Sequence, residues 1–262
     1  MKVNVNRSTE IGFAAILICI LAVAACAMSP WDQERADAHV NIGAAYLGSA
    51  RYNDALKELL EAEKLSPRDP SVHYYLGITY YRKGLSDNAV DEFKKALALK
   101  PGYSEVQNYL GVIYLEKGQW DGAIQYFKDA LSNPLYETPD KALFNIGMAY
   151  QGKKDFDKAL KYLEEAKNKR PNTVPIALID LHMGLICYDQ GDFKKATTYF
   201  KSSIKTDPNL LQSRYGLGLS YLKLNDPEKA KTEFKAIVEA APDTELGKEA
   251  KKSLDSLVSG RR

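Results

Sequence analysis

The sequence predicts an all-α fold of repeated helical hairpins. Two observations support this prediction: a pair of apolar helix faces joined by a polar turn, and the recurrence of this pair along the chain. In residues 70–103, a first apolar face is followed by a polar turn with a glycine and then by a second apolar face. Both faces have the spacing of an amphipathic helix, in which residues three to four apart lie on one side. The first face contains Leu76, Gly77 and Tyr80, and the second contains Ala89, Phe93 and Ala96.

The same pattern recurs along the chain and can be aligned on one glycine in each repeat. These glycines are Gly43, Gly77, Gly111, Gly147, Gly184 and Gly218. Three of the five spacings between them are 34 residues, and a tyrosine follows three positions later in every copy except one, which has Cys187. A second-helix alanine then precedes a Leu or Phe by four residues. Small residues suit the places where paired helices cross closely, and the large ones fill the space between hairpins.

This period and its fixed Gly, Tyr, Ala and Pro positions resemble the tetratricopeptide repeat. The resemblance implies a right-handed superhelical solenoid in which each hairpin contacts its neighbours. We expect six repeats within residues 36–242, followed by a capping helix and tail at 243–262. The expected repeats are 36–69, 70–103, 104–139, 140–176, 177–210 and 211–242.

The N-terminal residues have the pattern of a secretory signal peptide. Lys2 and Arg7 precede a stretch without charge, Ile11 to Met28, and small residues lead up to Cys26. This arrangement resembles the lipobox of bacterial lipoproteins, which implies removal of residues 1–25, lipidation of Cys26 and a short linker over 26–35. Ala27, in place of Asp, then implies delivery to the outer membrane. The alternative is an uncleaved anchor, because eighteen uncharged residues are just enough to span a bilayer.

Composition and spacing indicate no catalytic chemistry. The 36 basic and 34 acidic side chains nearly balance, so nucleic-acid binding is not expected. His39, His73 and His182 stand in different repeats without metal-ligand spacing, and we expect them at surface or groove positions. The acids, Glu92 among them, are expected on solvated helix faces, and Cys187 is expected to be a small buried residue. We therefore expect no enzyme activity, metal, cofactor or small-molecule substrate.

A protein-binding groove lined by the first helices remains as the candidate site. Tetratricopeptide arrays usually bind peptides or partner helices there, and aromatic side chains with a few amides and an Arg are typical of a protein-binding surface. The candidate groove residues are Tyr74, Tyr75, Ile78, Tyr81, Arg82, Asn108, Tyr109, Val112, Leu115, Phe144, Asn145, Met148, Leu185, Tyr188, Tyr215 and Leu219.

The joint between the third and fourth repeats is irregular and carries a narrower resemblance. Asn133-Pro-Leu-Tyr-Glu-Thr-Pro139 is two residues longer than the regular spacing, and Asn145-Ile-Gly147 follows it. With the lipobox and six repeats, this joint resembles the type IV pilus biogenesis lipoproteins of the PilF/PilW kind. A further three-residue expansion with Pro175, before Gly184, departs from that pattern.

The resemblance implies a pilotin, a protein that helps the pilus secretin to reach the outer membrane and to form its multimer. A lipid on Cys26 would hold the chain at the periplasmic face of that membrane. An envelope adaptor that recruits a peptidoglycan hydrolase, a protease or other secretion machinery is the alternative. A third possibility is a cytosol-facing scaffold on an uncleaved anchor.

Overall fold

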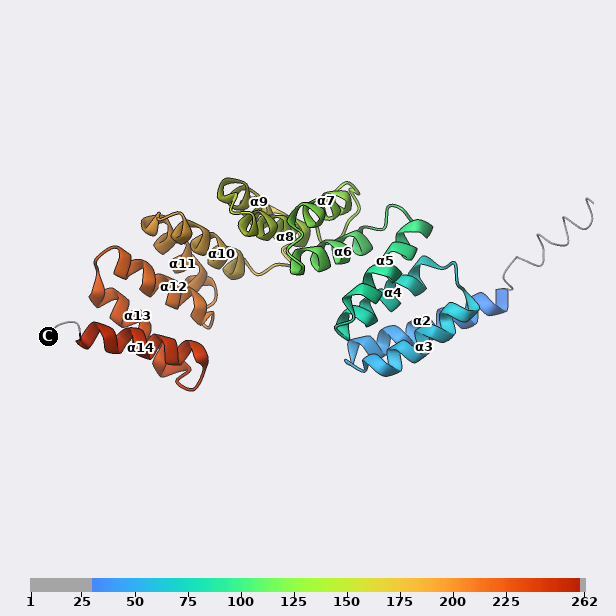
Figure 1. The fold of residues 1–262 in the computed structure, drawn as a ribbon, viewed down its shortest axis with the longest axis horizontal. Helices are drawn as coiled ribbons and strands as arrows, with labels where there is room; N and C mark the ends of the chain where they lie inside the picture. Colours follow the sequence, from blue (N-terminus) through green and yellow to red (C-terminus); the bar gives the residue numbers. More distant parts are fainter. Residues whose placement is uncertain (1–29, 260–262) are drawn as a thin grey trace, which may run out of the picture. The chain divides into compact units, whose positions relative to one another are not determined.

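The computed structural model describes residues 30–259, which form thirteen α-helices and contain no strand (Figure 1). The helices are α2 (Pro30–Gly48), α3 (Tyr52–Leu65), α4 (Pro70–Arg82), α5 (Ser86–Leu99), α6 (Ser104–Glu116), α7 (Trp120–Leu131), α8 (Pro139–Gly152), α9 (Phe156–Asn168), α10 (Ile176–Asp189), α11 (Phe193–Thr206), α12 (Leu211–Lys223), α13 (Pro227–Ala240) and α14 (Glu245–Ser259). The predicted all-α hairpin fold is confirmed. Among these helices, none has the length and apolar content needed to cross a membrane. The predicted signal peptide and Cys26 lie outside the described residues.

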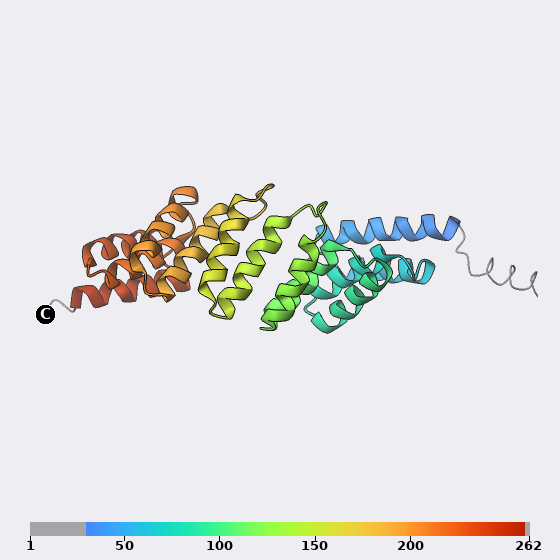
Figure 2. The same cartoon turned by 90° about the horizontal axis from the view of Figure 1, so that it is seen from above.

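The chain divides into two compact units between Pro101 and Gly102. The described part of the first unit contains α2 to α5, drawn in blue and cyan in Figure 2. The second unit contains α6 to α14. Each unit consists of consecutive antiparallel hairpins, and the second unit also has the additional helix α14.

A very close approach between the recurring glycine and a large side chain holds each hairpin together. A Cβ atom on Gly111 would lie 2.5 Å from a ring carbon of Phe127, which is far shorter than a van der Waals contact. The same geometry recurs between Gly77 and Phe93. The rings of these phenylalanines are fully buried. Glycine is therefore required by packing at this position, because only a bare Cα lets the second-helix ring lie against the first helix.

Successive hairpins also pack on one another within each unit. In the first unit α4 contacts both α2 and α3, and in the second unit α12 contacts α10, α11, α13 and α14. The helix α14 ends the second unit by placing Ala250, which is fully buried, against the cluster that contains Phe234. Leu246, Leu254 and Leu257 pack beside it, as expected for a capping helix.

A buried carboxylate organises the expanded joint between α9 and α10. Asp140, in the first turn of α8, is inaccessible to solvent. Its side chain accepts hydrogen bonds from the backbone N–H and hydroxyl of Thr173 and from the backbone N–H of Val174, the last at 2.8 Å. Hydrogen bonds to the charged form compensate for its loss of water. This contact fixes the course of residues 169–175, which include the expansion seen in the sequence.

The expectation that His73 lies at a surface or groove position is wrong. His73 is only 3% exposed, and its Nδ1 lies 2.7 Å from Glu92 on α5, which is itself buried rather than on a solvated face. Its Nε2 lies 2.9 Å from the carbonyl oxygen of Pro67. Both ring nitrogens thus face oxygen acceptors, an arrangement that favours the protonated ring. Glu63 on α3 and Lys95 on α5 complete the charged group around it.

The pKa values in this group follow from its hydrogen bonds. The hydrogen bond with Glu92 raises the pKa of His73 above its ordinary value, against the opposing effect of burial. Burial by itself would raise the pKa of Glu92, but hydrogen bonds from His73 and Lys95 outweigh it and lower that pKa. The His73–Glu92 pair therefore stabilises the first unit most at pH values between the pKa of Glu92 and the pKa of His73.

We expect Gly111→Ala to destabilise the second unit. The added Cβ would overlap the Phe127 ring, and this overpacking should exceed the gain in helix propensity, for a net loss of about 1–2 kcal/mol. Urea denaturation would measure the change in unfolding free energy. Gly102→Ala is the matched control, since nothing lies within 4 Å of the position that its Cβ would take, and it should change stability by less than about 0.5 kcal/mol. Equal effects of the two substitutions would contradict the packing argument.

We expect the stability contribution of His73 to depend on pH. Because its pKa is raised on folding, the contribution is complete below its unfolded value of about 6.5 and is lost as the pH rises through the folded value. The difference in urea midpoint between the wild type and His73→Gln should therefore be larger at pH 6 than at pH 9. Hydrogen exchange in α4 and α5 would localise the effect.

His39→Gln is the control for this prediction. His39 pairs with Glu58 at the same register one repeat earlier, but its side chain is 29% exposed and solvent screens the pair. Its substitution should have the smaller effect at pH 6. A midpoint difference for His73→Gln that stays constant with pH would show that charge is not its main contribution.

Candidate protein-binding surface

The candidate groove residues of the first unit lie along α4. Tyr74, Tyr75 and Tyr81 are half-buried, whereas Ile78 is buried and Arg82 is exposed. The rings of Tyr74 and Tyr75 contact each other with centroids 5.1 Å apart. Tyr75 also packs against the core cluster of this unit. The helix thus presents partly covered aromatic side chains, with the guanidinium of Arg82 at its C-terminal end.

The candidate groove residues of the second unit lie on α6, α8, α10 and α12, and all are half-buried. Several also pack against the core: Val112, Leu115 and Phe144 on one cluster, and Leu185, Tyr188, Tyr215 and Leu219 on another. The remaining candidates are Asn108, Tyr109, Asn145 and Met148. Partial burial leaves part of each side chain available for contact with a partner.

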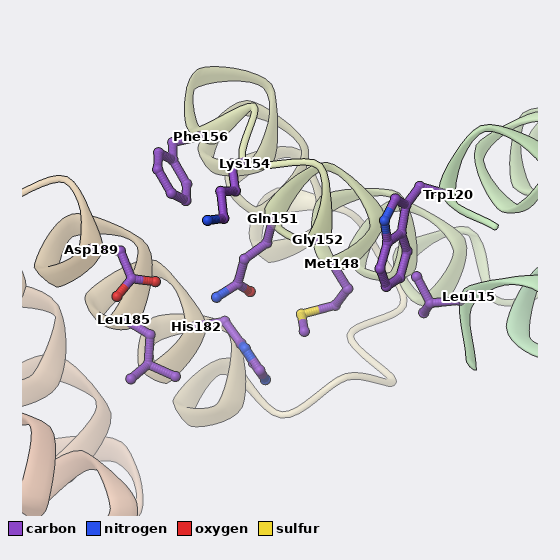
Figure 3. A pocket seen from close by; sticks show the side chains of 10 residues that line it. All are labelled: Leu115, Trp120, Met148, Gln151, Gly152, Lys154, Phe156, His182, Leu185 and Asp189. Atoms are coloured by element: carbon purple, nitrogen blue, oxygen red, sulfur yellow. The ribbon is translucent and has the colours of Figure 1, made fainter. Parts of the chain in front are cut away.

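Three of these residues line a pocket of about 830 Å³ in the second unit, which we call the α8–α10 pocket (Figure 3). They are Leu115, Met148 and Leu185. The other lining residues are Trp120, Gln151, Gly152, Lys154, Phe156, His182 and Asp189. In Figure 3 the side chains of Met148, Gln151 and His182 lie at its centre, and Trp120 stands beside Met148. The volume is in the range of small-ligand and peptide side-chain sites.

The pocket lies beside α10, the helix that follows the expanded joint. The helix α6 packs on α8, and α10 packs on α12, but no comparable contact joins α8 to α10. Residues 169–175 separate α9 from α10, whereas only residues 207–210 separate α11 from α12. Length alone does not separate helices, because the equally long connection 132–138 leaves α8 packed on α6. The course of residues 169–175, which Asp140 holds, accompanies the wider spacing of α8 and α10. The edge contact of the Phe144 and His182 rings, with centroids 5.4 Å apart, bridges the two helices.

Two polar atoms in the pocket lack a hydrogen-bond partner. The Oε1 atom of Gln151 and the Nδ1 atom of His182 are both shielded from solvent and unsatisfied. Such a group costs about 1–3 kcal/mol when buried without a partner. Burial lowers the pKa of His182, so its ring is neutral at pH 7. The centre of the pocket is therefore uncharged and has unused hydrogen-bonding capacity.

Sequence reasoning missed most of the pocket, although one signal was available. Trp120 begins a second helix and was not among the first-helix candidates, yet its indole covers Gly152, where a Cβ would lie 2.9 Å from the ring. Gln151 and His182 occupy first-helix positions but were not among the candidates either. The expansion containing Pro175 was the usable signal, because it directly precedes α10, which supplies His182 and other residues of the lining.

The first unit also contains a cluster of acidic and histidine side chains that the spacing in the sequence did not reveal. One ligand atom each from Glu63, His73 and Glu92 lie within 4.8 Å of one another, a grouping that can hold a metal ion. In this geometry Lys95 lies 2.8 Å from Glu92 and 3.6 Å from Glu63, and the hydrogen bond with Glu92 raises the pKa of His73. The ammonium group of Lys95 thus already pairs with both carboxylates, which explains the group as a hydrogen-bonded ion-pair network. Cys187, in the second unit, is buried as expected, and burial raises its pKa.

The solved structures that share this fold include PilF, PilW and YrrB. PilF of Pseudomonas aeruginosa is 19% identical, with a TM-score of 0.71 over 84% of this chain and 98% of that one. PilW, described as a widely conserved type IV pilus biogenesis factor, is 20% identical, with a TM-score of 0.75 over 82% of this chain and 97% of that one. YrrB, described as having an unusual peptide-binding site, is 20% identical, with a TM-score of 0.57 over 74% and 97%. At such identities the likeness establishes the fold.

One curated relative, the photosystem I assembly protein Ycf3 of Acaryochloris marina, is 34% identical over 76 residues. The matched residues make up 29% of this chain and 46% of the relative. The chain therefore spans about half the length of the relative.

Models of one repeat family match most of the described helices. The TPR repeat model matches residues 51–84, and two tetratricopeptide-repeat models match residues 80–134 with 188–254 and residues 140–173. Together these matches cover more than half of the chain. Repeats of this kind are typically non-catalytic scaffolds that bind other proteins. With its consecutive hairpins and their Gly–Phe contacts, the chain belongs to the tetratricopeptide-repeat family.

Proposed function

We propose that the chain is a non-catalytic lipoprotein that assists type IV pilus assembly by binding the outer-membrane secretin and helping it to localise or multimerise. The observation that carries this proposal is the fold likeness to PilF and PilW, which extends over 98% and 97% of those chains. The description of PilW as a pilus biogenesis factor supplies the process. The half-buried side chains along the first helices supply a surface of the kind that binds proteins.

The sequence of the joint between the third and fourth repeats also supports this proposal, and hydrogen bonds define the local geometry of that joint. Asn133 donates to the hydroxyl of Ser104 at 3.0 Å and accepts from the backbone N–H of Leu135 at 3.0 Å. Tyr136 is buried beneath the joint, whereas Leu135 is 85% exposed. Asn133, Leu135 and Tyr136 all belong to the Asn-Pro-Leu-Tyr sequence that resembles the PilF/PilW lipoproteins.

Lipid attachment to Cys26 is the second part of the proposal and rests on the sequence. After removal of residues 1–25, the lipid would tether the repeats to the periplasmic face of the outer membrane. One acyl chain binds membranes only marginally, whereas several chains anchor firmly. The multiple acylation typical of bacterial lipoproteins would therefore keep the protein at the membrane where the secretin assembles.

Deleting the gene should lower the amount of secretin multimer and abolish pilus-dependent motility. The physical reason is that unassembled secretin subunits lose the protein that holds them for insertion. Immunoblotting of detergent-resistant multimers, with the secretin monomer as the loading reference, would measure the effect. Restoration by the wild-type gene is the control. Normal multimers in the deletion strain would refute the pilus role and direct attention to an adaptor for a peptidoglycan hydrolase or protease.

Replacing Cys26 by Ser should leave the protein folded but remove it from the outer-membrane fraction. Serine lacks the thiol to which a diacylglycerol group is attached, and Cys26 precedes the predicted repeats. Membrane fractionation with metabolic palmitate labelling would follow the change, and circular dichroism would confirm the helical content. A Cys26→Ser protein that remains in the outer-membrane fraction would argue against lipidation. Mass spectrometry of the mature N-terminus would distinguish cleavage from an uncleaved anchor.

A further inference from the structure

The α8–α10 pocket has features that select one kind of occupant. Its walls are formed by Leu115, Trp120, Met148, Phe156 and Leu185, which are all half-buried. Such walls favour an apolar group over a charged one, because a charge would lose its water without gaining a partner. The flexible thioether of Met148 can adjust to the shape of an aliphatic side chain.

The charges around the pocket also favour a neutral occupant. Lys154 and Asp189 are the two ionised side chains that line it, and both are exposed to solvent. Their charges are opposite, so neither sign of ligand gains a net attraction. The neutral ring of His182 adds no charge at the centre. An uncharged side chain is therefore the complement of this lining.

The unsatisfied polar atoms distinguish an extended segment from a helix. The N–H groups inside a helix are already bonded to its own carbonyl groups, whereas an extended segment carries N–H groups that are free to donate. Gln151 Oε1 has no donor, and its side chain lies between α8 and α10 beside His182 (Figure 3). Rotation of the flexible glutamine side chain would turn this oxygen toward a segment that runs past the pocket.

We propose that the α8–α10 pocket binds an uncharged aliphatic side chain, such as leucine, on an extended polypeptide segment whose backbone N–H donates to Gln151. This inference rests on the proposed function, since it names the part of the surface that takes the protein partner and the chemistry of the segment taken. It also gives a role to the expansion containing Pro175, which directly precedes the pocket-lining helix α10.

Titration of the full chain with defined peptides tests this directly. The probe is an acetylated, amidated heptapeptide with a central leucine among threonine and serine residues, which keep it extended. The methyl group of Met148, labelled with ¹³C, reports on the pocket, and that of Met183, which is 2% exposed and does not line it, is the internal control. The leucine peptide should shift the Met148 signal and leave Met183 unchanged.

Two changes to the peptide test its chemistry. Replacing the central leucine by lysine or aspartate should abolish the Met148 shift, and a helical alanine-rich peptide with one leucine should bind no better than these. Methylating the backbone nitrogen that donates should weaken binding by about fivefold, the value of one hydrogen bond. Methylating each amide next to the leucine in turn would identify that nitrogen.

The variant Gln151→Leu tests the proposed acceptor, because it keeps an apolar side chain of similar size. In this variant the methylated and unmethylated peptides should bind equally. Gln125→Leu is the matched control, since Gln125 is exposed on α7 and does not line the pocket, and it should retain the fivefold preference. An unchanged Met183 signal would show that both variants are folded.

Several results would overturn the inference. They are no Met148 shift at millimolar leucine peptide, an equal shift with the lysine or helical peptide, or a methylation preference that survives in Gln151→Leu. In cells, normal secretin multimers with Gln151→Leu beside their loss in the deletion strain would refute the pocket inference alone. Normal multimers in the deletion strain, with peptide binding as expected in solution, would refute the pilus role alone.

Discussion

The contact between a first-helix glycine and a second-helix aromatic or leucine side chain is the constraint on which this fold depends. At Gly218, for example, an added Cβ would lie 2.6 Å from the Phe234 ring. The contact brings the two helix axes together and removes the ring from water, which by itself stabilises by about 1.5–3 kcal/mol for each fully buried ring. Each hairpin therefore has closely packed helices, and it buries its remaining apolar faces by stacking on the next hairpin.

The same residues also act between hairpins, which couples the repeats within a unit. The ring of Phe200 lies against Gly184 of its own hairpin and against Gly216 of the next one, where an added Cβ would be 2.5 Å away. The buried carboxylate of Asp180 and its two partners help to fix how the helices are oriented in this packing. Asp180 is inaccessible to solvent and is held by Lys167 and Ser202, each at 2.6 Å. The apolar contacts provide the stability, and such polar contacts specify how consecutive helices are oriented.

The departures from regularity are where the candidate function lies. The first helix α6 packs on α8, and α10 packs on α12, whereas α8 and α10 are spaced more widely and border a pocket. Asp140 makes this separation a defined feature, because its buried carboxylate requires donors that Thr173 and Val174 supply. The chain can thus vary its binding surface through the course of a connection without changing the hairpins.

The repeat pattern by itself determined the fold class, because every hairpin has the same Gly and Ala spacing, followed by a large apolar Leu or Phe, and these residues interact within a short stretch of chain. Tertiary structure decided the pocket and the charged group. Trp120, Gln151 and His182 come from three different helices, and Glu63, His73 and Glu92 come from three others. Their proximity depends on how separate hairpins pack and on the course of residues 169–175. Local periodicity does not encode those distances, since each side chain is placed by contacts with residues far away in the sequence.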